Sequence, residues 1–330
     1  MVDIERRPKE LLRPRHLRSG KLFVGVDGGG TKTHAVVVDD SDQVLGEGTT
    51  GPSNPLRVGV TSAAGAIREA VEVACNMAQV RRTDILAAEV GLAGTRRKEL
   101  RARMEDALKS LDIREIEVVS NADIALFGAS GGEPGVVVIA GTGSISCGLN
   151  ARGKRVCAGG WGPIAGDEGG GAWIARRGLR AIAHAADGRG PETALTAAAC
   201  AYFHVSTADD LSTAIYAPTI TNERIAGFAR NVIEAAKYRD RVSRQIMVEA
   251  GTELGVAAAA VIRNLKMEDE LFQVAYVGGV FAAGEMLLEA LRAELAAIAP
   301  RAFLAPPRFP PAVAAARMAR ENLNRVALAV

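Results

Sequence analysis

Three consecutive glycines, Gly28 to Gly30, separate two β-rich segments near the start of the sequence. The segment Leu22–Val26 precedes them and the segment Ala35–Asp39 follows them, so the order predicts a strand, a tight turn and a second strand. Because glycine has no Cβ, the backbone N–H groups of such a turn can approach an anion closely. The chain must therefore fold so that an anion-binding turn joins two neighbouring strands. A Walker loop, which opens a helix after the motif G-x-x-x-x-G-K-[ST], is excluded.

The residues around the glycines indicate that the anion bound by this turn is the phosphate chain of a nucleotide. Thr31, Lys32 and Thr33 add two hydroxyl groups and an ammonium group. Asp27 offers the hard oxygen ligand that Mg²⁺ or its waters prefer. An ordinary glycine-rich hairpin turn is the alternative, but it does not account for these polar neighbours. The predicted phosphate-binding set is Asp27, Gly28, Gly29, Gly30, Thr31, Lys32 and Thr33, with Asp27 as the metal ligand.

Two further glycine loops follow strand-like segments at wide spacing. Gly141-Thr142-Gly143-Ser144 comes directly after Val136–Ala140, and Gly278-Gly279 comes directly after Gln273–Val277. Since each strand delivers a glycine loop, we expect three loops to converge on one ligand from two halves of the molecule. This adds Gly141, Thr142, Gly143, Gly278 and Gly279 to the predicted nucleotide-binding residues.

In this order, the three glycine segments resemble those of the sugar kinase, actin and Hsp70 ATPase superfamily. The segments GPSNP (51–55), GWG (160–162) and GDEG (166–169) resemble more closely its N-acetylglucosamine kinase and BadF-type ATPase branch. The resemblance implies an α/β fold of two duplicated ribonuclease H-like (actin-like ATPase) domains with a cleft between them. It also implies an ATP- and Mg²⁺-dependent kinase that phosphorylates the 6-hydroxyl of an amino sugar such as N-acetylglucosamine or glucosamine.

The pattern of elements predicts a duplicated layout. Apolar residues recur at helical spacing from Val60 to Ala78, and short strands are expected at 89–92 and 116–120 with a helix at 97–108 between them. The second half repeats this outline, with a strand at 136–140, a hairpin at 144–158, a helical block at 169–264, a strand at 273–277 and a helix at 284–299. We expect a flexible basic tail at 1–20 and domains at 21–133 and 134–330, with a last helix at 312–329 that could pack on either domain.

Composition limits the partners and the compartment. The chain has 330 residues and a net charge of +2. We expect no membrane-spanning helix, because no apolar run in the sequence approaches the roughly 18 residues that such a helix needs. We therefore expect a cytoplasmic homodimer that binds a small-molecule sugar and neither nucleic acid nor membrane, although a membrane- or partner-binding role for the basic tail stays open. The four scattered cysteines are expected to be reduced, with Cys147 and Cys157 close across a hairpin. They provide neither the cysteine pair of iron–sulfur activator ATPases nor the zinc segment of repressor-type relatives.

The resemblance assigns Asn54 and Asp167 to the sugar side of the cleft, and the chemistry of an aromatic ring between two glycines adds Trp161. Asn54 would face sugar hydroxyls, Trp161 would offer a flat platform for the ring, and Asp167 would contact O3 or O4. Local sequence gives alternatives, because Asn54 precedes a proline as a turn cap does and Asp167 could cap a helix. The predicted substrate-binding set is Asn54, Thr142, Gly160, Trp161, Gly162 and Asp167.

The chain departs from the superfamily where the resemblance expects a catalytic aspartate. That position, just after the strand Glu117–Ser120, holds Asn121, whose neutral carboxamide cannot take a proton near pH 7. The nearest carboxylate is Asp123, which on a helix would point in a different direction from Asn121. Three readings follow: an inactivated variant that keeps its ligands, an active enzyme with Asp123 or Asp167 as the base, or a register displaced by two residues.

Overall fold

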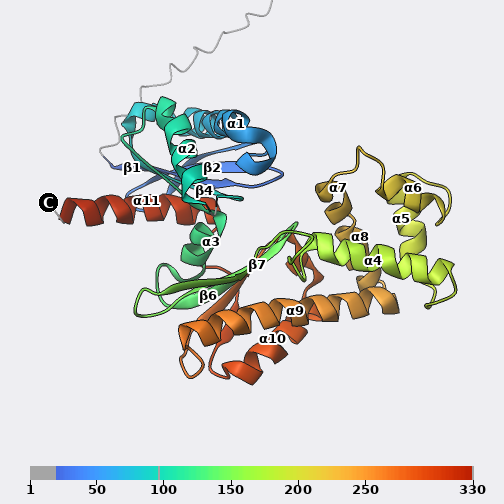
Figure 1. Ribbon diagram of the computed structural model, residues 1–330. Coiled ribbons are helices and arrows are strands. Elements are labelled where there is room, and N and C mark those ends of the chain that lie inside the picture. The colour runs from blue at the N-terminus through green and yellow to red at the C-terminus, as the bar shows by residue number, and fades with distance from the viewer. Residues whose placement is uncertain (1–19, 96, 329–330) are drawn as a thin grey trace, which may run out of the picture.

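The computed structural model describes residues 20–95 and 97–328. The predicted basic tail therefore lies almost entirely outside the described residues. Two mixed five-stranded sheets form the framework (Figure 1).

The first sheet has the strand order β3-β2-β1-β4-β5. Its first three strands form an antiparallel meander, and β4 and β5 run parallel to β1. Its strands are β1 (Leu22–Gly28), β2 (Thr33–Asp39), β3 (Val44–Thr50), β4 (Ile85–Leu92) and β5 (Glu115–Ser120). The helices of this half are α1 (Pro55–Ala78), the 3₁₀ turns Arg82–Asp84 and Lys109–Leu111, α2 (Lys98–Leu108) and α3 (Asn121–Ser130).

The second sheet repeats this arrangement. Its order is β10-β9-β6-β7-β8, with an antiparallel meander on one side of β6 and two parallel strands on the other. Its strands are β6 (Gly135–Ala140), β7 (Ser144–Leu149), β8 (Arg155–Gly159), β9 (Gln273–Val277) and β10 (Phe303–Ala305). This repetition confirms the predicted duplication.

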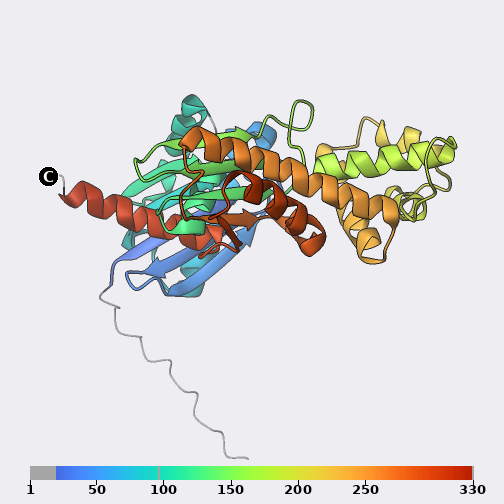
Figure 2. The same ribbon diagram turned by 90° about the horizontal axis from the view of Figure 1, so that it is seen from below.

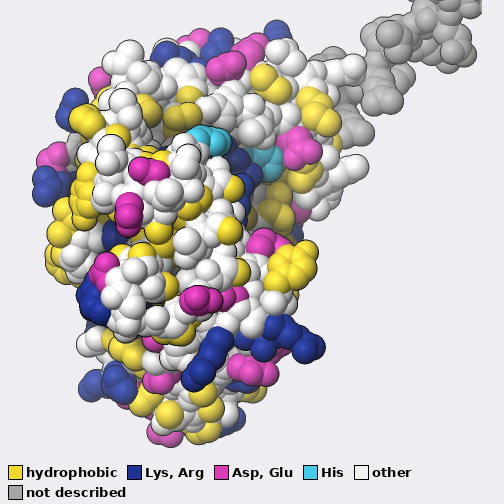
Figure 3. All heavy atoms as spheres, turned by 90° about the vertical axis from the view of Figure 1, so that its right-hand side faces the viewer, with side chains coloured by type: hydrophobic (Ala, Val, Ile, Leu, Met, Phe, Trp, Pro, Cys, Tyr) yellow, Lys and Arg dark blue, Asp and Glu magenta, His cyan; other side chains and the backbone are white. Residues whose placement is uncertain are grey.

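Most helices of the second half lie between β8 and β9. They are α4 (Gly171–Ala186), α5 (Leu195–Phe203), α6 (Asp210–Ile215), α7 (Asn222–Gly227), α8 (Ala229–Lys237) and α9 (Arg241–Leu265), followed later by a 3₁₀ turn (Gly279–Ala283), α10 (Glu285–Ile298) and α11 (Pro311–Leu328). Figure 2 shows α4 to α8 extending away from the sheets, with α9 running from the sheets into this extension. At its outer end, acidic and basic side chains are intermixed (Figure 3).

The helix α1 covers one face of the first sheet. Its buried stripe includes Ala63, Ile67 and Ala74, as the apolar periodicity predicts. A Cβ on Gly46 or Gly48 of β3 would lie within 2.3 Å of a backbone carbonyl oxygen of α1. Glycine at these two positions therefore lets the helix approach the strand closely.

The other face of the first sheet is covered by α11, which the sequence left unplaced. Figure 1 shows α11 running along the first sheet. Its Ala312, Ala316 and Ala319 pack against apolar side chains that include Phe23 and Val36. Conversely, α3 packs on the second sheet through alanines and Leu126. We call the first sheet with α1, α2 and α11 the first lobe, and the second sheet with α3 to α10 the second lobe. Packing thus crosses the expected boundary at residue 134 twice, and that boundary stays a prediction.

The long helix α9 is a core helix of the second lobe. By length and composition alone it is the one described helix that could cross a membrane, yet 56% of its apolar window is buried inside the structure. It packs closely on α10 at Gly251 and Gly255. A Cβ on Gly251 would lie 2.3 Å from Leu287 O, and one on Gly255 would lie 2.5 Å from Glu294 Cβ. Core packing thus accounts for its apolar composition.

The contact between β1 and α11 leads to a stability prediction. A Cβ on the buried Gly25 would lie 1.9 Å from Ala312 O, so Gly25→Ala must displace α11. We expect the free energy of unfolding to fall by about 2–3 kcal/mol. In the control Gly65→Ala on α1, where the added methyl meets no atom within 4 Å, it should rise by about 0.5–1 kcal/mol. Urea denaturation measures both, and equal stability of the two variants would contradict this packing.

A buried carboxyl group under α11 gives a pH prediction. Glu89 of β4 is fully buried, and its Oε2 accepts a hydrogen bond from Asn322 Nδ2 at 3.2 Å while its Oε1 has no partner within the described chain. Burial, with added repulsion from Glu117, raises the pKa of Glu89 to about 8. The folded state therefore prefers the protonated form, whereas the unfolded chain ionises near pH 4.5.

We expect the stability contributed by protonated Glu89 to be complete below pH 4.5 and to be lost as pH rises towards 8. Glu89→Gln, which keeps a neutral group, should flatten this decline and should be more stable than the parent at pH 8. The control is Glu99→Gln on the exposed face of α2. Urea unfolding at pH 5 and pH 8 measures the effect, and parallel pH profiles of parent and Glu89→Gln would disprove it.

Candidate active site

A cavity of about 680 Å³ lies between the two lobes. The first lobe contributes the β1–β2 turn, the start of α1, the loop after β4 and Arg101. The second lobe contributes the start of α3, the β6–β7 turn, β8 and the segment 160–167. The cavity thus unites the first two predicted glycine loops with most of the predicted sugar-side residues.

The first glycine turn reaches this cleft through Gly29 and Gly30. Gly29 N donates to Lys32 O at 2.9 Å and closes the turn, while Gly29 O accepts hydrogen bonds from the backbone of Ser53 and Asn54. A Cβ on Gly29 would meet no atom closer than 3.5 Å, so space for an approaching group is present. A Cβ on Gly28, by contrast, would collide with Ser53 Oγ at 2.3 Å, so Gly28 is required for packing.

The polar neighbours of the turn occupy different environments. Thr31 and Lys32 are exposed beside it, and neither is among the cleft-lining residues. Thr33 is fully buried, where its Oγ1 hydrogen-bonds Gly51 O and Ser53 Oγ, each at 2.7 Å. Thr33 therefore ties the turn to the segment before α1, away from the phosphate position that the sequence assigned to it.

Asp27 is the last residue but one of β1 and lies beside the turn. Burial raises the pKa of its carboxyl group, while the charges of Lys32 and His34 lower it in part. A bound divalent cation would offset this cost further, so the site fits Mg²⁺ chemically. The described residues contain no group of three or more acidic, histidine or cysteine side chains that could hold a metal alone. Such a Mg²⁺ would therefore need phosphate or water ligands.

The second glycine loop, Gly141 to Ser144, lines the cleft from the second lobe. The first backbone N–H groups of α4 hold it, because Gly171 N donates to Gly141 O at 2.8 Å and Ala172 N donates to Thr142 O at 2.9 Å. A Cβ on Gly143 would lie 2.2 Å from Asp167 Oδ2. Glycine at 143 therefore permits the carboxylate of Asp167 to lie against the loop.

The third loop does not line the cavity. Gly278 has φ +122° and a Cβ there would lie 2.2 Å from Ala140 O, so its position against the end of β6 requires glycine. Gly279 is exposed and has open space around its Cα. The nucleotide-binding role of Gly278 and Gly279 stays a prediction.

The sugar-side residues divide into two groups. Asn54, Gly160, Gly162 and Asp167 line the cleft, whereas Trp161 is 69% exposed and is not part of the lining. Asn54 is also the N-cap of α1, since its Oδ1 accepts from Leu56 N at 3.0 Å. The capping interpretation of Asn54 is therefore correct. Asn54 caps α1 and lines the cleft at the same time.

Asp167 does not cap a helix, contrary to the alternative from local sequence. The N-cap of α4 is Gly170, and Asp167 Oδ1 instead accepts from Gly162 N at 3.3 Å. Asp167 has φ +59°, a left-handed backbone that is uncommon outside glycine. Burial raises the pKa of its carboxyl group, and hydrogen bonds from the backbone of Gly162 and Ser144 lower it in part.

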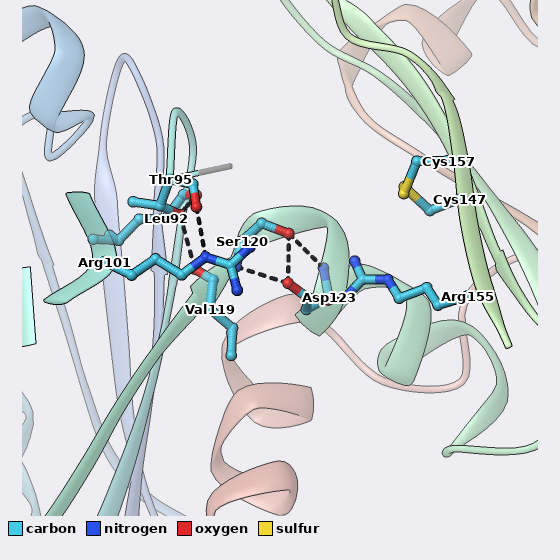
Figure 4. Close-up of polar contacts among 9 residues, drawn as sticks. All are labelled: Leu92, Thr95, Arg101, Val119, Ser120, Asp123, Cys147, Arg155 and Cys157. Carbon is cyan, nitrogen blue, oxygen red and sulfur yellow. Dashed lines mark hydrogen bonds and ion pairs between the residues drawn. A yellow bond between two sulfur atoms is a disulfide. The ribbon is translucent and has the colours of Figure 1, made fainter. Parts of the chain in front are cut away.

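Asn121 and Asp123 lie in different environments at the start of α3. Figure 4 shows Asp123 beside Ser120 and Arg155. Asn121 lines the cleft, and Asp123 does not. Asp123 Oδ2 accepts hydrogen bonds from Ser120 N at 2.8 Å and Ser120 Oγ at 2.6 Å, and Ser120 Oγ accepts from Asp123 N in return. Asp123 Oδ1 forms an ion pair with Arg155. Asp123 is thus a helix-capping residue, and this geometry argues against it as the proton acceptor.

Sequence reasoning did not find three arginines of the cleft, Arg57, Arg101 and Arg155. No motif marks them, because they come from α1, α2 and β8 and meet only in the folded chain. Arg57 forms an ion pair with Glu223 of α7 and so joins the two lobes.

The cysteine expectation needs correction. Cys147 and Cys157 face each other on β7 and β8 with Cα atoms 4.1 Å apart, and their sulfurs are joined in a disulfide instead of being reduced. The predicted proximity across the hairpin is confirmed. Cys157 also lines the cleft. Cys75 and Cys200 are free thiols.

Comparison with known proteins agrees with this geometry. The model of the BadF/BadG/BcrA/BcrD ATPase family matches residues 24–316, and the chain belongs to this family. An N-acetylmuramic acid/N-acetylglucosamine kinase of Clostridium acetobutylicum is 34% identical over 79% of this chain and 85% of its own. An N-acetyl-D-glucosamine kinase of Dictyostelium discoideum is 33% identical over 79% of this chain and 86% of its own.

A solved structure confirms the fold. The crystal structure of a proposed N-acetylglucosamine kinase from Chromobacterium violaceum superposes with a TM-score of 0.73 at 28% identity. The match covers 89% of this chain and 97% of that one. The expected two-domain α/β architecture with a cleft between the domains is therefore confirmed.

The first glycine turn leads to a binding prediction. Gly29→Val places a branched side chain in the open space where a phosphate must approach, so we expect ATP affinity to fall by at least tenfold while the fold persists. Calorimetry measures ATP binding, and thermal unfolding checks the fold. Gly65→Val on α1 is the matched control, and parental ATP affinity in folded Gly29→Val would remove the turn from the nucleotide site.

Proposed function

We propose that this protein is an ATP-dependent sugar kinase that phosphorylates the 6-hydroxyl of an amino sugar such as N-acetylglucosamine or glucosamine. The observation that carries this proposal is the single cleft in which glycine turns from both lobes meet Asn54, Asn121 and Asp167. A phosphate chain and a sugar hydroxyl could thus lie side by side. The sugar kinases that resemble this chain at about one third identity support the same reading.

The residues of the cleft supply positioning and charge. Phosphoryl transfer depends mainly on alignment of the reactants and on neutralisation of phosphate charge. Gly29, Gly30 and the Gly141–Gly143 loop would cradle the phosphates through backbone N–H groups. Asp27 would hold Mg²⁺, which when bound neutralises phosphate charge. We further propose that Trp161 covers the sugar when the lobes close, which would exclude water and suppress ATP hydrolysis.

The proton acceptor is the part of the site that differs most from the pattern expected of the superfamily. Asn121 occupies the cleft but cannot accept a proton, and Asp123 is engaged in the helix cap and the ion pair with Arg155. Asp167 is the one acidic side chain among the described cleft-lining residues. We propose that Asp167 takes the proton of the acceptor hydroxyl, with slow turnover because the position of the missing carboxylate holds Asn121.

A second candidate function follows from the same observation. A cleft that retains its glycine turns but presents a carboxamide at the catalytic position suits a weakly active or non-catalytic sugar- and nucleotide-binding protein. The two functions differ in turnover and share ligand binding. In either case we propose a cytoplasmic homodimer with a small-molecule sugar as its ligand. The sugar kinase relatives support the sugar ligand.

An acceptor screen tests the proposed function. Release of ADP is measured with glucose, glucosamine, N-acetylglucosamine and N-acetylmuramic acid, each against a control without sugar. We expect sugar-dependent release with at least one amino sugar. Tight sugar binding without any sugar-dependent release would favour the non-catalytic function.

Substitutions at the catalytic position separate the two functions. Asn121→Asp should raise turnover with N-acetylglucosamine by about 10²–10⁴ with little change in its affinity, because that is the usual contribution of a positioned base. Asp167→Asn should abolish the parent's residual turnover and act on kcat more than on KM. Asp123→Asn, the matched control on α3, should lower stability through loss of the cap and leave turnover within a few-fold. Parental turnover in Asp167→Asn would overturn its role as the base.

A further inference from the structure

A second cavity, of about 780 Å³, lies in the helical extension and shares no lining residue with the cleft between the lobes. Its two walls are the outer half of α4 and the first turns of α9, which run side by side into the extension (Figure 1). The proposed kinase function uses none of these residues. We call this cavity the extension groove. Its polar lining residues are Arg177, Arg180, His184, Arg241, Gln245 and Glu249.

Helical spacing places these side chains on two facing surfaces. The three from α4 follow one another at intervals of three and four residues, and the three from α9 recur every four residues, so each set shares one helix face. Arg177 forms an ion pair with Glu249 across the groove. Because α4 begins at the cleft whereas α9 begins in the extension, Arg180, His184 and Arg241 lie beyond this pair, towards the outer end.

The three outer side chains have no partner within the described chain. In residues 20–95 and 97–328, the side chains of Arg180, His184 and Arg241 form neither a hydrogen bond nor an ion pair. Arg180 and Arg241 are exposed, and His184 is half-buried. Two unpaired guanidinium groups and an imidazole that line one groove favour a bound anion.

The neighbouring carboxylates do not neutralise this charge. Asp187, just after α4, pairs with Arg189. Asp240 caps α9 and accepts hydrogen bonds from Thr193 Oγ1. Glu192 is exposed and is not part of the groove lining. The outer end of the groove therefore keeps an excess of positive charge.

The rest of the groove has the chemistry of a site for a sugar. Val242 and Ile246 of α9 form an apolar part of its lining. Beside them, Gln245 Nε2 donates a hydrogen bond to Glu249 Oε1 at 3.3 Å, so an amide and a carboxylate lie next to each other. Together these two groups offer donors and acceptors to hydroxyl groups. An apolar surface beside such a pair suits a ring that has apolar faces and a rim of hydroxyls.

We propose that the extension groove is a regulatory site for a phosphorylated sugar, separate from the cleft. Arg180 and Arg241 hold the phosphate, because a guanidinium presents parallel N–H donors that match two phosphate oxygens. His184 donates one further hydrogen bond. The preference for phosphate follows from the groove itself, whereas the choice of a sugar phosphate also rests on the proposed function, since a sugar kinase forms one.

Both walls of the groove continue to the cleft, which makes regulation physically direct. The first backbone N–H groups of α4 hold the glycine loop 141–144. On the other wall, α9 packs against Gly169, where a Cβ would lie 2.6 Å from Ala250 O. Ala250 follows Glu249 of the groove directly. A ligand that changes the spacing of α4 and α9 would therefore shift the second glycine loop and alter the affinity for ATP.

A tryptophan beside the groove allows its occupancy to be measured. The Arg177 guanidinium lies 5.3 Å from the ring centroid of Trp173, and Trp161→Phe leaves Trp173 as the one tryptophan of the chain. In this variant, fluorescence is followed at low salt during titration with N-acetylglucosamine 6-phosphate, N-acetylglucosamine or inorganic phosphate. We expect the sugar phosphate to bind about tenfold more tightly than the neutral sugar and about threefold more tightly than inorganic phosphate.

Equal affinities for the sugar phosphate and the neutral sugar would overturn the proposal. Equal affinities for the sugar phosphate and inorganic phosphate would overturn the sugar as part of the ligand.

Further substitutions in the Trp161→Phe protein assign the binding to the groove. In the double variant Arg180→Gln/Arg241→Gln, affinity for the sugar phosphate should fall about tenfold. The matched control is Arg230→Gln, which removes an exposed arginine of α8 whose side chain has no hydrogen bond or ion pair in the described chain. Its affinity should stay parental. Thermal unfolding checks the fold, and parental affinity in the folded double variant would overturn the site.

Calorimetric ATP binding with and without the sugar phosphate tests regulation. We expect the sugar phosphate to change the ATP affinity of the parent, and this change to be lost in Arg180→Gln/Arg241→Gln. No change in the parent, or an equal change in both proteins, would overturn the regulatory role.

Failure of the groove and failure of the kinase proposal give different results. Saturable binding of the sugar phosphate that depends on Arg180 and Arg241, without any sugar-dependent ADP release, would overturn only the kinase function. Sugar-dependent ADP release from a parent whose Trp161→Phe form shows no response of Trp173 to the sugar phosphate would overturn only the groove.

Discussion

The reciprocal cap between Ser120 and Asp123 controls the chemistry available in the cleft. By accepting hydrogen bonds from Ser120, the Asp123 carboxylate starts α3 and turns away from the cavity. Asn121 is then the residue of this helix start that, with Ser120 and Ala122, lines the cleft. The same carboxylate anchors Arg155 from the second lobe. One short polar cluster therefore fixes a helix start, removes a candidate base and positions a cation.

The cleft exists because each lobe is completed by a helix from the other part of the chain. The strand order is the same in both sheets, yet α3 covers the second sheet and α11 covers the first. Each sheet needs both faces covered to bury its β-branched side chains. The exchange of helices brings the ends of β1 and β6, with their glycine turns, to opposite sides of one cavity. Duplication and exchange together thus produce the shared site.

Much of the fold could be predicted from the sequence, since strands, turns and helix periodicity are local signals. The turn at Gly28 to Gly30 and the loop at Gly141 to Ser144 were predicted for this reason. Arg101 and Arg155 could not be predicted as cleft residues, because they come from different lobes and meet only when the lobes pack together. The contacts of Thr33 and Asp123 could not be predicted for a related reason. A polar side chain beside a motif can bind neighbouring protein groups instead of a ligand, and its burial depends on the whole fold.

The covering of the first sheet by α11 has a consequence for biosynthesis. Phe23 and Val36 belong to strands near the start of the chain, but the alanines that bury them come from residues 312–319. During translation one apolar face of the first sheet therefore stays bare until the whole second lobe has been made. The two lobes cannot mature one after the other, as ordinary tandem domains do. Such a nascent chain would need protection from aggregation until α11 emerges from the ribosome.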